Sequence, residues 1–322
     1  MMDGKCLIIY NEPAPDALPD ELDVIDQVNF IEATLKKIGI NAQRRGITED
    51  FFSEMALIAE EDFDFVFNLA EAVGKRAEIL YFIPALLNMH HIPYTGCSVE
   101  AAFLSGSKVL ARQIMKAHGI PVAGGYKISE AAGMTPGRKY ILKPVWEDGS
   151  LGITEESVFT FDGSIPDILK GKDDSHWFIE EFIEGREFNV SVKSSPDGPV
   201  MLPPAEIVFH DYPDDLPRIV SYKAKWEEDT FQYHSSRRCF PDDLSSTLLN
   251  KLEKTVMACW TTFSLRGYAR VDIRVDGNEN VYVLEINANP CISPDGGFIA
   301  AALHAGQTHE EIIGDIIRDL NR

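Results

Sequence analysis

The sequence predicts an α/β protein that also contains α+β elements. In the first hundred residues, short apolar runs alternate with segments of helical spacing, which is typical of a parallel sheet covered by helices. Later, two runs of alternating apolar and polar residues flank the turn-rich loop 276–280, and this pattern predicts a β-hairpin. With 322 residues, of which 45% are hydrophobic, the chain is long enough for two or three compact units.

The first predicted unit, residues 1–97, alternates strands and helices. Helices are expected where apolar residues recur every three or four positions, as at Val24, Val28 and Ile31. Gly39 suits the end of the first helix, because glycine adopts the left-handed conformation that follows many helices. The predicted elements are strands at 6–10, 40–45 and 63–69, and helices at 23–39, 49–61 and 74–89.

The second predicted unit, residues 98–187, contains two lysines at the edges of predicted elements. Lys108 precedes a helix that is expected to reach residue 118, and Lys143 lies near the end of a strand at 140–144. A loop with two glycines follows at 146–153, and another strand is expected at 177–183. A lysine beside a tight glycine loop can reach phosphate oxygens that backbone N–H groups also bind. Solvated lysines are the alternative interpretation.

The third predicted unit, residues 188–322, begins with alternating strands. Residues 208–240 interrupt this pattern with many charges and aromatic rings and few periodic apolar residues. A loop of this length in a compact domain is usually functional or disordered, so we expect a loop with a role in the site. A helix is predicted at 244–263, the hairpin at 269–287, and a closing amphipathic helix at 308–320.

The hairpin carries polar residues that can converge on one site. Residues two positions apart in a strand share a face, so Arg270 lies beside Asp272 and Glu285 lies beside Asn287. Two carboxylates and an amide oxygen are hard ligands that suit Mg²⁺ held against phosphates rather than zinc. An exposed polar face is the alternative, but the strand ends abruptly in the small and polar residues 287–293, which favours a site.

This hairpin resembles the metal-binding end of ATP-grasp carboxylate–amine ligases, and most closely the D-alanine–D-alanine ligase family. The resemblance implies the ATP-grasp fold, in which a parallel-sheet N-terminal domain accompanies two lobes that clamp ATP. It implies Asp272, Glu285 and Asn287 as ligands of two magnesium ions, for which manganese can substitute. It also implies that Arg270 faces the reacting carboxyl and phosphoryl groups.

Three further segments are similar to nucleotide-binding parts of this family. Residues 141–152 resemble its strand, lysine and phosphate-grasping loop, and residues 180–187 resemble its adenine hinge. Residues 222–226 resemble its lid, which excludes water from a labile acyl phosphate, although Trp226 replaces the family's tyrosine. The ATP-binding residues implied are Lys108, Lys143, Glu147, Gly149, Ser150, Glu180, Glu181, Phe182, Ile183, Glu187 and Lys225.

The amino-acid end departs from the family. In the N-terminal loop only Glu12 could replace the family's acid, and Asp295, followed by two glycines and Phe298, stands where the family has a serine. D-Alanine is therefore expected to be a poor substrate or none, and the amine partner to be larger or positively charged. The resemblance implies Arg270, Lys225, Ser150 and Glu12 as catalytic residues, and Arg270, Asp295, Gly296 and Trp226 as substrate-binding residues.

The predicted function is an ATP-dependent ligase that joins a carboxylate to an amine through an acyl phosphate. Two alternatives are a true D-alanine–D-alanine ligase of cell-wall synthesis and a nucleotide-binding sensor or scaffold without ligase turnover. The expected partners are small amino-acid or carboxylate substrates, and the resemblance suggests a homodimer. A net charge of −21 disfavours nucleic acid and anionic membranes as partners. Scattered cysteines without a CxxC pair, and no signal peptide or spanning segment, predict a cytoplasmic location.

Overall fold

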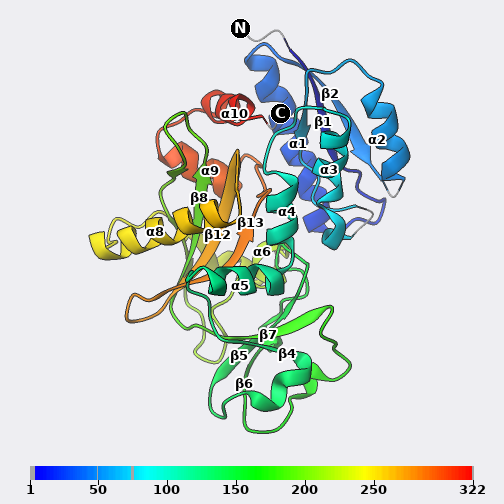
Figure 1. The fold of residues 1–322 in the computed structure, drawn as a ribbon. Coiled ribbons are helices and arrows are strands. Elements are labelled where there is room, and N and C mark those ends of the chain that lie inside the picture. The colour runs from blue at the N-terminus through cyan, green and yellow to red at the C-terminus, as the bar shows by residue number, and fades with distance from the viewer. Residues whose placement is uncertain (1–3, 49, 74–75, 321–322) are drawn as a thin grey trace.

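The computed structural model describes residues 4–48, 50–73 and 76–320 and arranges them around three sheets (Figure 1). Glu49 and Gly74, where two helices were expected to begin, lie outside the described residues. The α/β class predicted from the sequence is confirmed, with one parallel sheet and two sheets of antiparallel pairs. In the described part of the chain, no helix combines the length and the apolar character needed to cross a membrane.

The N-terminal sheet is parallel, in the order β2-β1-β3. Alternate residues of its central strand face opposite helices: Ile8 packs in a core cluster with Val28 of the first helix, and Ile9 packs in another with Met55 of the second. Burial on both faces explains why this strand is an unbroken apolar run. Its elements are β1 (Lys5–Asn11), α1 (Pro19–Lys37), β2 (Asn41–Ile47), α2 (Phe51–Ala59), β3 (Phe65–Asn68), the 3-10 helix η1 (Ala77–Ile79) and α3 (Phe82–Met89).

Two helix boundaries in this region differ from the prediction. Helix α1 begins at Pro19, four residues before the predicted start, because proline is well suited to the first helical position. The helix predicted at 74–89 is shorter and begins at Phe82, after η1. Pro84 lies in the first turn of α3, where its missing N–H breaks no helical hydrogen bond.

The central sheet has the order β4-β7-β5-β6, and its strands pair antiparallel. Two helices precede it, and the second of them begins at Lys108, which was predicted to lie just before this helix. The elements are α4 (Val99–Gly106), α5 (Lys108–Ala117), β4 (Gly125–Lys127), η2 (Ile128–Gly133), β5 (Lys139–Pro144), η3 (Glu155–Ser157), β6 (Val158–Thr160), η4 (Asp167–Leu169) and β7 (Trp177–Glu181).

The third sheet has the order β11-β10-β8-β12-β13, with β9 paired to the edge of β8. The predicted hairpin is confirmed as the antiparallel pair β12–β13. The elements are β8 (Arg186–Lys193), β9 (Val200–Met201), β10 (Ala205–Phe209), α6 (Tyr222–Trp226), α7 (Phe231–Ser235), β11 (Ser236–Cys239), α8 (Ser246–Thr262), β12 (Tyr268–Val275), β13 (Val281–Asn287), α9 (Gly297–His304) and α10 (His309–Arg318).

The prediction of one long loop at 208–240 is wrong. This segment contains α6, α7 and β11, and β11 pairs with β10 at the sheet edge. Each helix is only five residues long, too short to show a periodic pattern, and is started by a side-chain cap from Ser221 or Thr230. Helix α9 was not predicted, because it begins directly after Gly296 with a second glycine.

Hydrophobic side chains pack across the domain boundaries predicted from the sequence. Those boundaries themselves remain a prediction. Helices α4 and α5 lie within the predicted second unit, yet Ala101 and Met115 belong to the core cluster of the β8–β12–β13 sheet. Helices α9 and α10 follow that sheet in sequence, but Phe298 and Ile313 pack in the cluster that covers one face of β1. Figure 1 shows the same arrangement, with α10 beside the N-terminal unit.

Candidate active site

A cleft of about 470 Å³ is lined by residues of the central sheet, the third sheet and helix α1. Nearly all residues implied by the sequence line it, and the exceptions are Glu12 and Asn287. The predicted residues on its walls are Lys108, Lys143, Glu147, Gly149, Ser150, Glu180, Glu181, Phe182, Ile183, Glu187, Lys225, Trp226, Arg270, Asp272, Glu285, Asp295 and Gly296.

The loop after β5 makes a tight turn at one end of this cleft. Gly149, Ser150 and Gly152 all have positive φ angles, of 64°, 66° and 76°. This region is unfavourable for serine, and residues held in such conformations cluster at ligand-binding sites. The Ser150 hydroxyl donates to the backbone oxygen of Val220 at 2.6 Å, which fixes the strained turn against the residues just before the lid segment.

Two lysines enter the cleft beside this turn. The Lys108 ammonium group donates to the Glu147 backbone oxygen and to Asp148 Oδ1, both at 2.6 Å, and lies 3.2 Å from Glu285. Burial alone would lower the pKa of Lys108, but the carboxylates of Asp148 and Glu285 outweigh this effect and raise the pKa. Burial lowers the pKa of Lys143 to about 8, and the positive charges of Arg112 and Lys108 add to that effect.

The hairpin presents its polar face to the cleft. The strand register places Asp272 opposite Glu285 and Arg270 opposite Asn287. Arg270 donates to both Asp272 oxygens, at 2.7 and 2.8 Å, and the Asn287 amide donates to the same carboxylate at 3.3 Å. A register shift after Asp272 turns both Leu284 and Glu285 toward the cleft, which plain alternation did not predict.

These residues fit a magnesium ion by their chemistry. Asp272, Glu285 and Asn287 offer oxygen atoms on neighbouring strands, and oxygen atoms are the ligands that magnesium prefers. Burial raises the pKa of Asp272 to about 6, whereas nearby Lys108 and Arg270 hold that of Glu285 below its usual range despite its burial. Among the described residues, no cluster of three or more His, Cys, Asp or Glu side chains could hold a metal, so the amide and the nucleotide must complete any magnesium site.

Two arginines that the sequence analysis did not assign support the segment 180–187. Arg112 forms an ion pair with one oxygen of the buried Glu180, and Lys143 approaches the other oxygen at 2.7 Å. Arg274 pairs with Glu187 at 2.8 Å and donates to the Ile183 backbone oxygen at 3.3 Å. Arg274 follows Arg270 and Asp272 on the same strand at a spacing of two, so the alternation that selected them could have found it.

The lid segment lies across the glycine turn. The Trp226 indole N–H donates to the Gly149 backbone oxygen at 2.8 Å, and the Lys225 ammonium group lies 4.7 Å from the centre of the indole ring. At the other end of α6, the Tyr222 hydroxyl donates to Asp20 Oδ1 of helix α1 at 2.7 Å. The lid therefore contacts both the glycine turn and the N-terminal unit.

Glu12 is not brought into the cleft, contrary to the expectation. It lies against β2, so closely that a Cβ atom at Gly46 would be 1.8 Å from its Oε2 atom. Asp23 of α1 lines the cleft instead, 3.2 Å from the Gln27 amide and 3.0 Å from the Cys291 thiol. No sequence pattern indicates Asp23 as a site residue, because its position depends on how α1 packs against the segment after β13.

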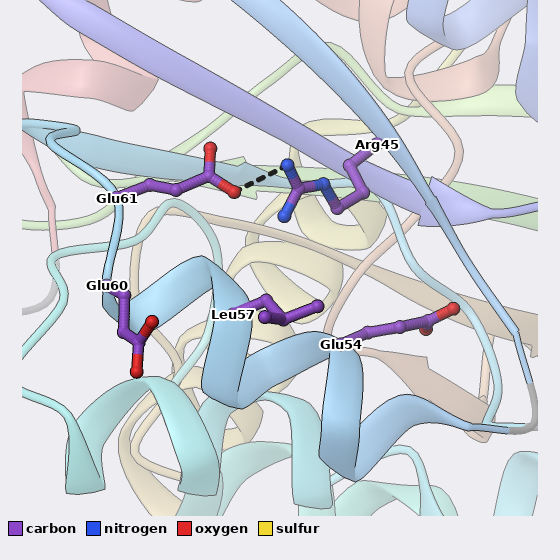
Figure 2. A pocket seen from close by; sticks show the side chains of 5 residues that line it. All are labelled: Arg45, Glu54, Leu57, Glu60 and Glu61. Carbon is purple, nitrogen blue, oxygen red and sulfur yellow. Dashed lines mark ion pairs between the residues drawn. The ribbon is translucent and has the colours of Figure 1, made fainter.

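A second hollow, of about 560 Å³, lies on the outer side of α2 and β2 (Figure 2). It is lined by Glu54, Glu60 and Glu61, together with Leu57 and Arg45. Figure 2 shows Arg45 pointing toward Glu61, and their ion pair measures 2.5 Å. Three carboxylates and one paired cation would repel phosphates, so the cleft between the sheets is the better nucleotide site.

An arginine from β11 reaches the start of α9 at the far end of the cleft. Arg238 donates to the backbone oxygens of Asp295, at 2.6 Å, and Gly296, at 3.2 Å. The Asp295 carboxylate accepts from the Ser293 hydroxyl at 3.1 Å. The sequence suggested an uncompensated acid at this end, but the structure places a guanidinium group beside it.

The chain matches a family model and many known proteins. The model described as "D-ala D-ala ligase C-terminus" matches residues 133–318. A D-alanine–D-alanine ligase of Carboxydothermus hydrogenoformans is 31% identical over 81% of this chain and 82% of its own length. The uncharacterized protein y4sG of Sinorhizobium fredii is 28% identical over 78% of this chain and 73% of its own length.

Solved structures show the same fold. A D-alanine–D-alanine ligase from Bacillus anthracis superposes with a TM-score of 0.77 at 20% identity, covering 98% of this chain and 96% of its own. The same enzyme complexed with ATP gives a TM-score of 0.74 at 18% identity, with the same coverage of both chains.

Proposed function

Because this chain belongs to the D-alanine–D-alanine ligase family of ATP-grasp enzymes, we propose that its cleft binds ATP and performs both steps of ligation. It is an ATP-dependent carboxylate–amine ligase. The observation that carries the assignment of the cleft is that Lys108, Lys143, Lys225 and Arg270 line one cleft together with a strained glycine turn, Asp272 and Glu285. A sensor without turnover is not favoured, because a protein that only binds nucleotide does not need this catalytic arrangement.

The nucleotide is proposed to lie between the two antiparallel sheets. Ile141, Phe182, Ile207 and Leu284 provide apolar walls for an adenine ring, and the segment held by Arg274 offers backbone groups to its edge. The phosphates would then lie at the glycine turn, near Lys108 and Lys143. Asp272, Glu285 and Asn287 would hold magnesium, whose charge neutralises the phosphates while the phosphoryl group transfers.

The proposed reaction has two steps. A carboxylate oxygen of the first substrate attacks the γ-phosphorus of ATP, the bond to the β-phosphate oxygen breaks, and ADP leaves. The amine nitrogen of the second substrate then attacks the carbonyl carbon of the acyl phosphate, phosphate leaves, and the nitrogen loses a proton. Arg270 and Lys225 offset the negative charge that develops, and the Trp226 contact with Gly149 excludes water from the intermediate.

An ADP-release assay tests this function, with the products identified by mass spectrometry. A panel of D- and L-amino acids, small carboxylates and ammonia is supplied with ATP and Mg²⁺. Lys225→Met is expected to lower the rate roughly 10²-fold, because a charge that stabilises the transition state is lost. Lys223→Met is the matched control, because Lys223 is an exposed residue of the same short helix and does not line the cleft. Equal rates for the two variants, or no acceptor-dependent ADP release, would contradict the proposal.

A further inference from the structure

Arg238 carries a positive charge without a carboxylate partner in the part of the chain that the structure describes. It lines the cleft at the end where α9 begins. Two other arginines of the cleft are paired with carboxylates: Arg270 lies 2.7 Å from Asp272, and Arg274 lies 2.8 Å from Glu187. Arg237, the neighbour of Arg238 on β11, also lines the cleft. The charge of Arg238 is therefore available to a ligand.

The guanidinium group of Arg238 is also held in place. Its two terminal nitrogens donate to the backbone oxygens of Asp295 and Gly296, at 2.6 and 3.2 Å. A guanidinium group has five N–H donors, and the remaining ones of Arg238 donate to no other described residue. A planar group that is fixed along one edge and open along another suits the two oxygens of a carboxylate.

The neighbours of Arg238 favour an anion. Burial lowers the pKa of Arg238, the positive charge of Arg270 lowers it further, and Asp295 opposes this effect. The same Arg270 approaches the start of α9, since its terminal nitrogen would be 3.9 Å from a Cβ atom at Gly297. Two arginines thus reach this end of the cleft, and an incoming negative charge would relieve their mutual repulsion.

We infer that Arg238 binds the carboxylate of the amine-donating substrate and so determines which acceptor this enzyme selects. The inference rests on the proposed function, because it assigns the second substrate to the end of the cleft beyond Arg270. It also replaces the expectation that Asp295 repels such a carboxylate, since Arg238 supplies the opposite charge beside it. Arg238 is therefore a residue that determines specificity, contributed by the edge strand β11.

If Arg238 had only a structural role, its removal would affect the different acceptors in another way. If its only task were to tie the start of α9 to β11, its removal would slow all acceptors to the same extent. If it binds the substrate, its removal penalises acceptors with a carboxylate and spares those without one. The ratio between two acceptors that differ only in this group separates the two roles.

The test compares the best acceptor amino acid of the panel with its carboxamide, which keeps the amine and removes the charge. Both are measured at a saturating concentration of the carboxylate substrate, with products identified by mass spectrometry. The wild-type enzyme is expected to prefer the amino acid about 10- to 100-fold in kcat/KM, the range of hydrogen bonds to charged groups. Arg238→Gln should reduce this preference to roughly threefold or less, and Arg238→Lys should restore part of it.

Arg44→Gln is the matched control, because Arg44 is an arginine of β2 outside the cleft and its loss changes the net charge equally. It should keep the wild-type preference. An equal loss for both acceptors in Arg238→Gln, or a wild-type enzyme that uses the carboxamide as well as the acid, overturns the inference. If Arg238→Gln does not fold, the inference is still tested by the preference of the wild-type enzyme and of Arg238→Lys for the amino acid over its carboxamide. Turnover with ammonia but with no amino acid would refute the inference alone, whereas no turnover with any acceptor would refute the proposed function as well.

Discussion

Replacing Arg274 with methionine tests whether a buried ion pair supports the nucleotide-binding segment. Arg274 is 3% exposed and Glu187 is 8% exposed, and 2.8 Å separates their charged groups. Arg274 also donates to the Ile183 backbone oxygen at 3.3 Å and lies 5.2 Å from the centre of the Phe182 ring. Methionine keeps much of the apolar volume and removes the charge and every donor.

The expected cost follows from the charge that is left behind. Removing one partner of a buried pair leaves an uncompensated carboxylate, and such changes lower the free energy of unfolding by about 3–5 kcal/mol. The double variant Arg274→Met with Glu187→Gln should recover most of this loss, because no unpaired charge stays buried. Its KM for ATP should nevertheless stay raised, because the Ile183 carbonyl group still lacks its donor.

Urea unfolding and steady-state kinetics on the same preparations measure both effects. Arg186→Met is the control, because Arg186 on the adjacent strand β8 pairs with Glu206 at 2.6 Å but is only half-buried and does not line the cleft. Its cost should be about 1 kcal/mol or less, with an unchanged KM for ATP. A loss below about 1 kcal/mol for Arg274→Met, or a double variant no more stable than the single one, would refute the reasoning.

Three further changes test other parts of the site. Glu285→Gln should fold normally, as checked by thermal unfolding. Its rate of ADP release should fall roughly 10²-fold or more, because a charge that faces the proposed magnesium site is lost. Glu253→Gln, a change at an exposed residue of α8, is the control and should keep full activity. Because the pKa of Lys143 is about 8, the KM for ATP should rise as the pH increases through 8, and Lys143→Arg, which stays charged, should remove that rise. Trp226→Phe loses the indole N–H contact with Gly149, so more ADP should form per amide produced; an unchanged ratio in a product assay would argue against water exclusion by the lid.

The nucleotide end of the cleft was predictable because its residues lie on regular, local elements. Alternation along one hairpin was enough to bring Asp272 and Glu285 to the same face, and the register confirms that they are opposite each other. Arg274 occupies the next position of the same alternation on β12, so the pattern that places Arg270 and Asp272 on one face also includes it. The bulge that turns Leu284 inward has no signature in a pattern of period two.

The lid was only partly predictable, because its helices are very short. Its lysine could be located by resemblance, but helices α6 and α7 each span five residues, less than two turns. Helices of this length are unstable alone, and their formation depends on caps such as Ser221 and on tertiary contacts such as that of Tyr222 with Asp20. Sequence periodicity cannot report contacts between residues 202 positions apart.

The substrate end was the least predictable part because tertiary packing alone determines which side chains reach it. Glu12 is close in sequence to a strand that borders the site, yet its side chain turns to β2, and Asp23 enters the cleft from the next helix. Arg238 meets Asp295 across 57 residues, from an edge strand inside what looked like a loop. The charge of Asp295 alone suggests a site that repels carboxylates, whereas the same acid beside Arg238 belongs to a site that we propose binds one. The charge that the second substrate would meet therefore depends on which side chains the folded sheet brings together. A substitution of Arg238 on β11 should change the choice of acceptor without altering the residues proposed to bind ATP.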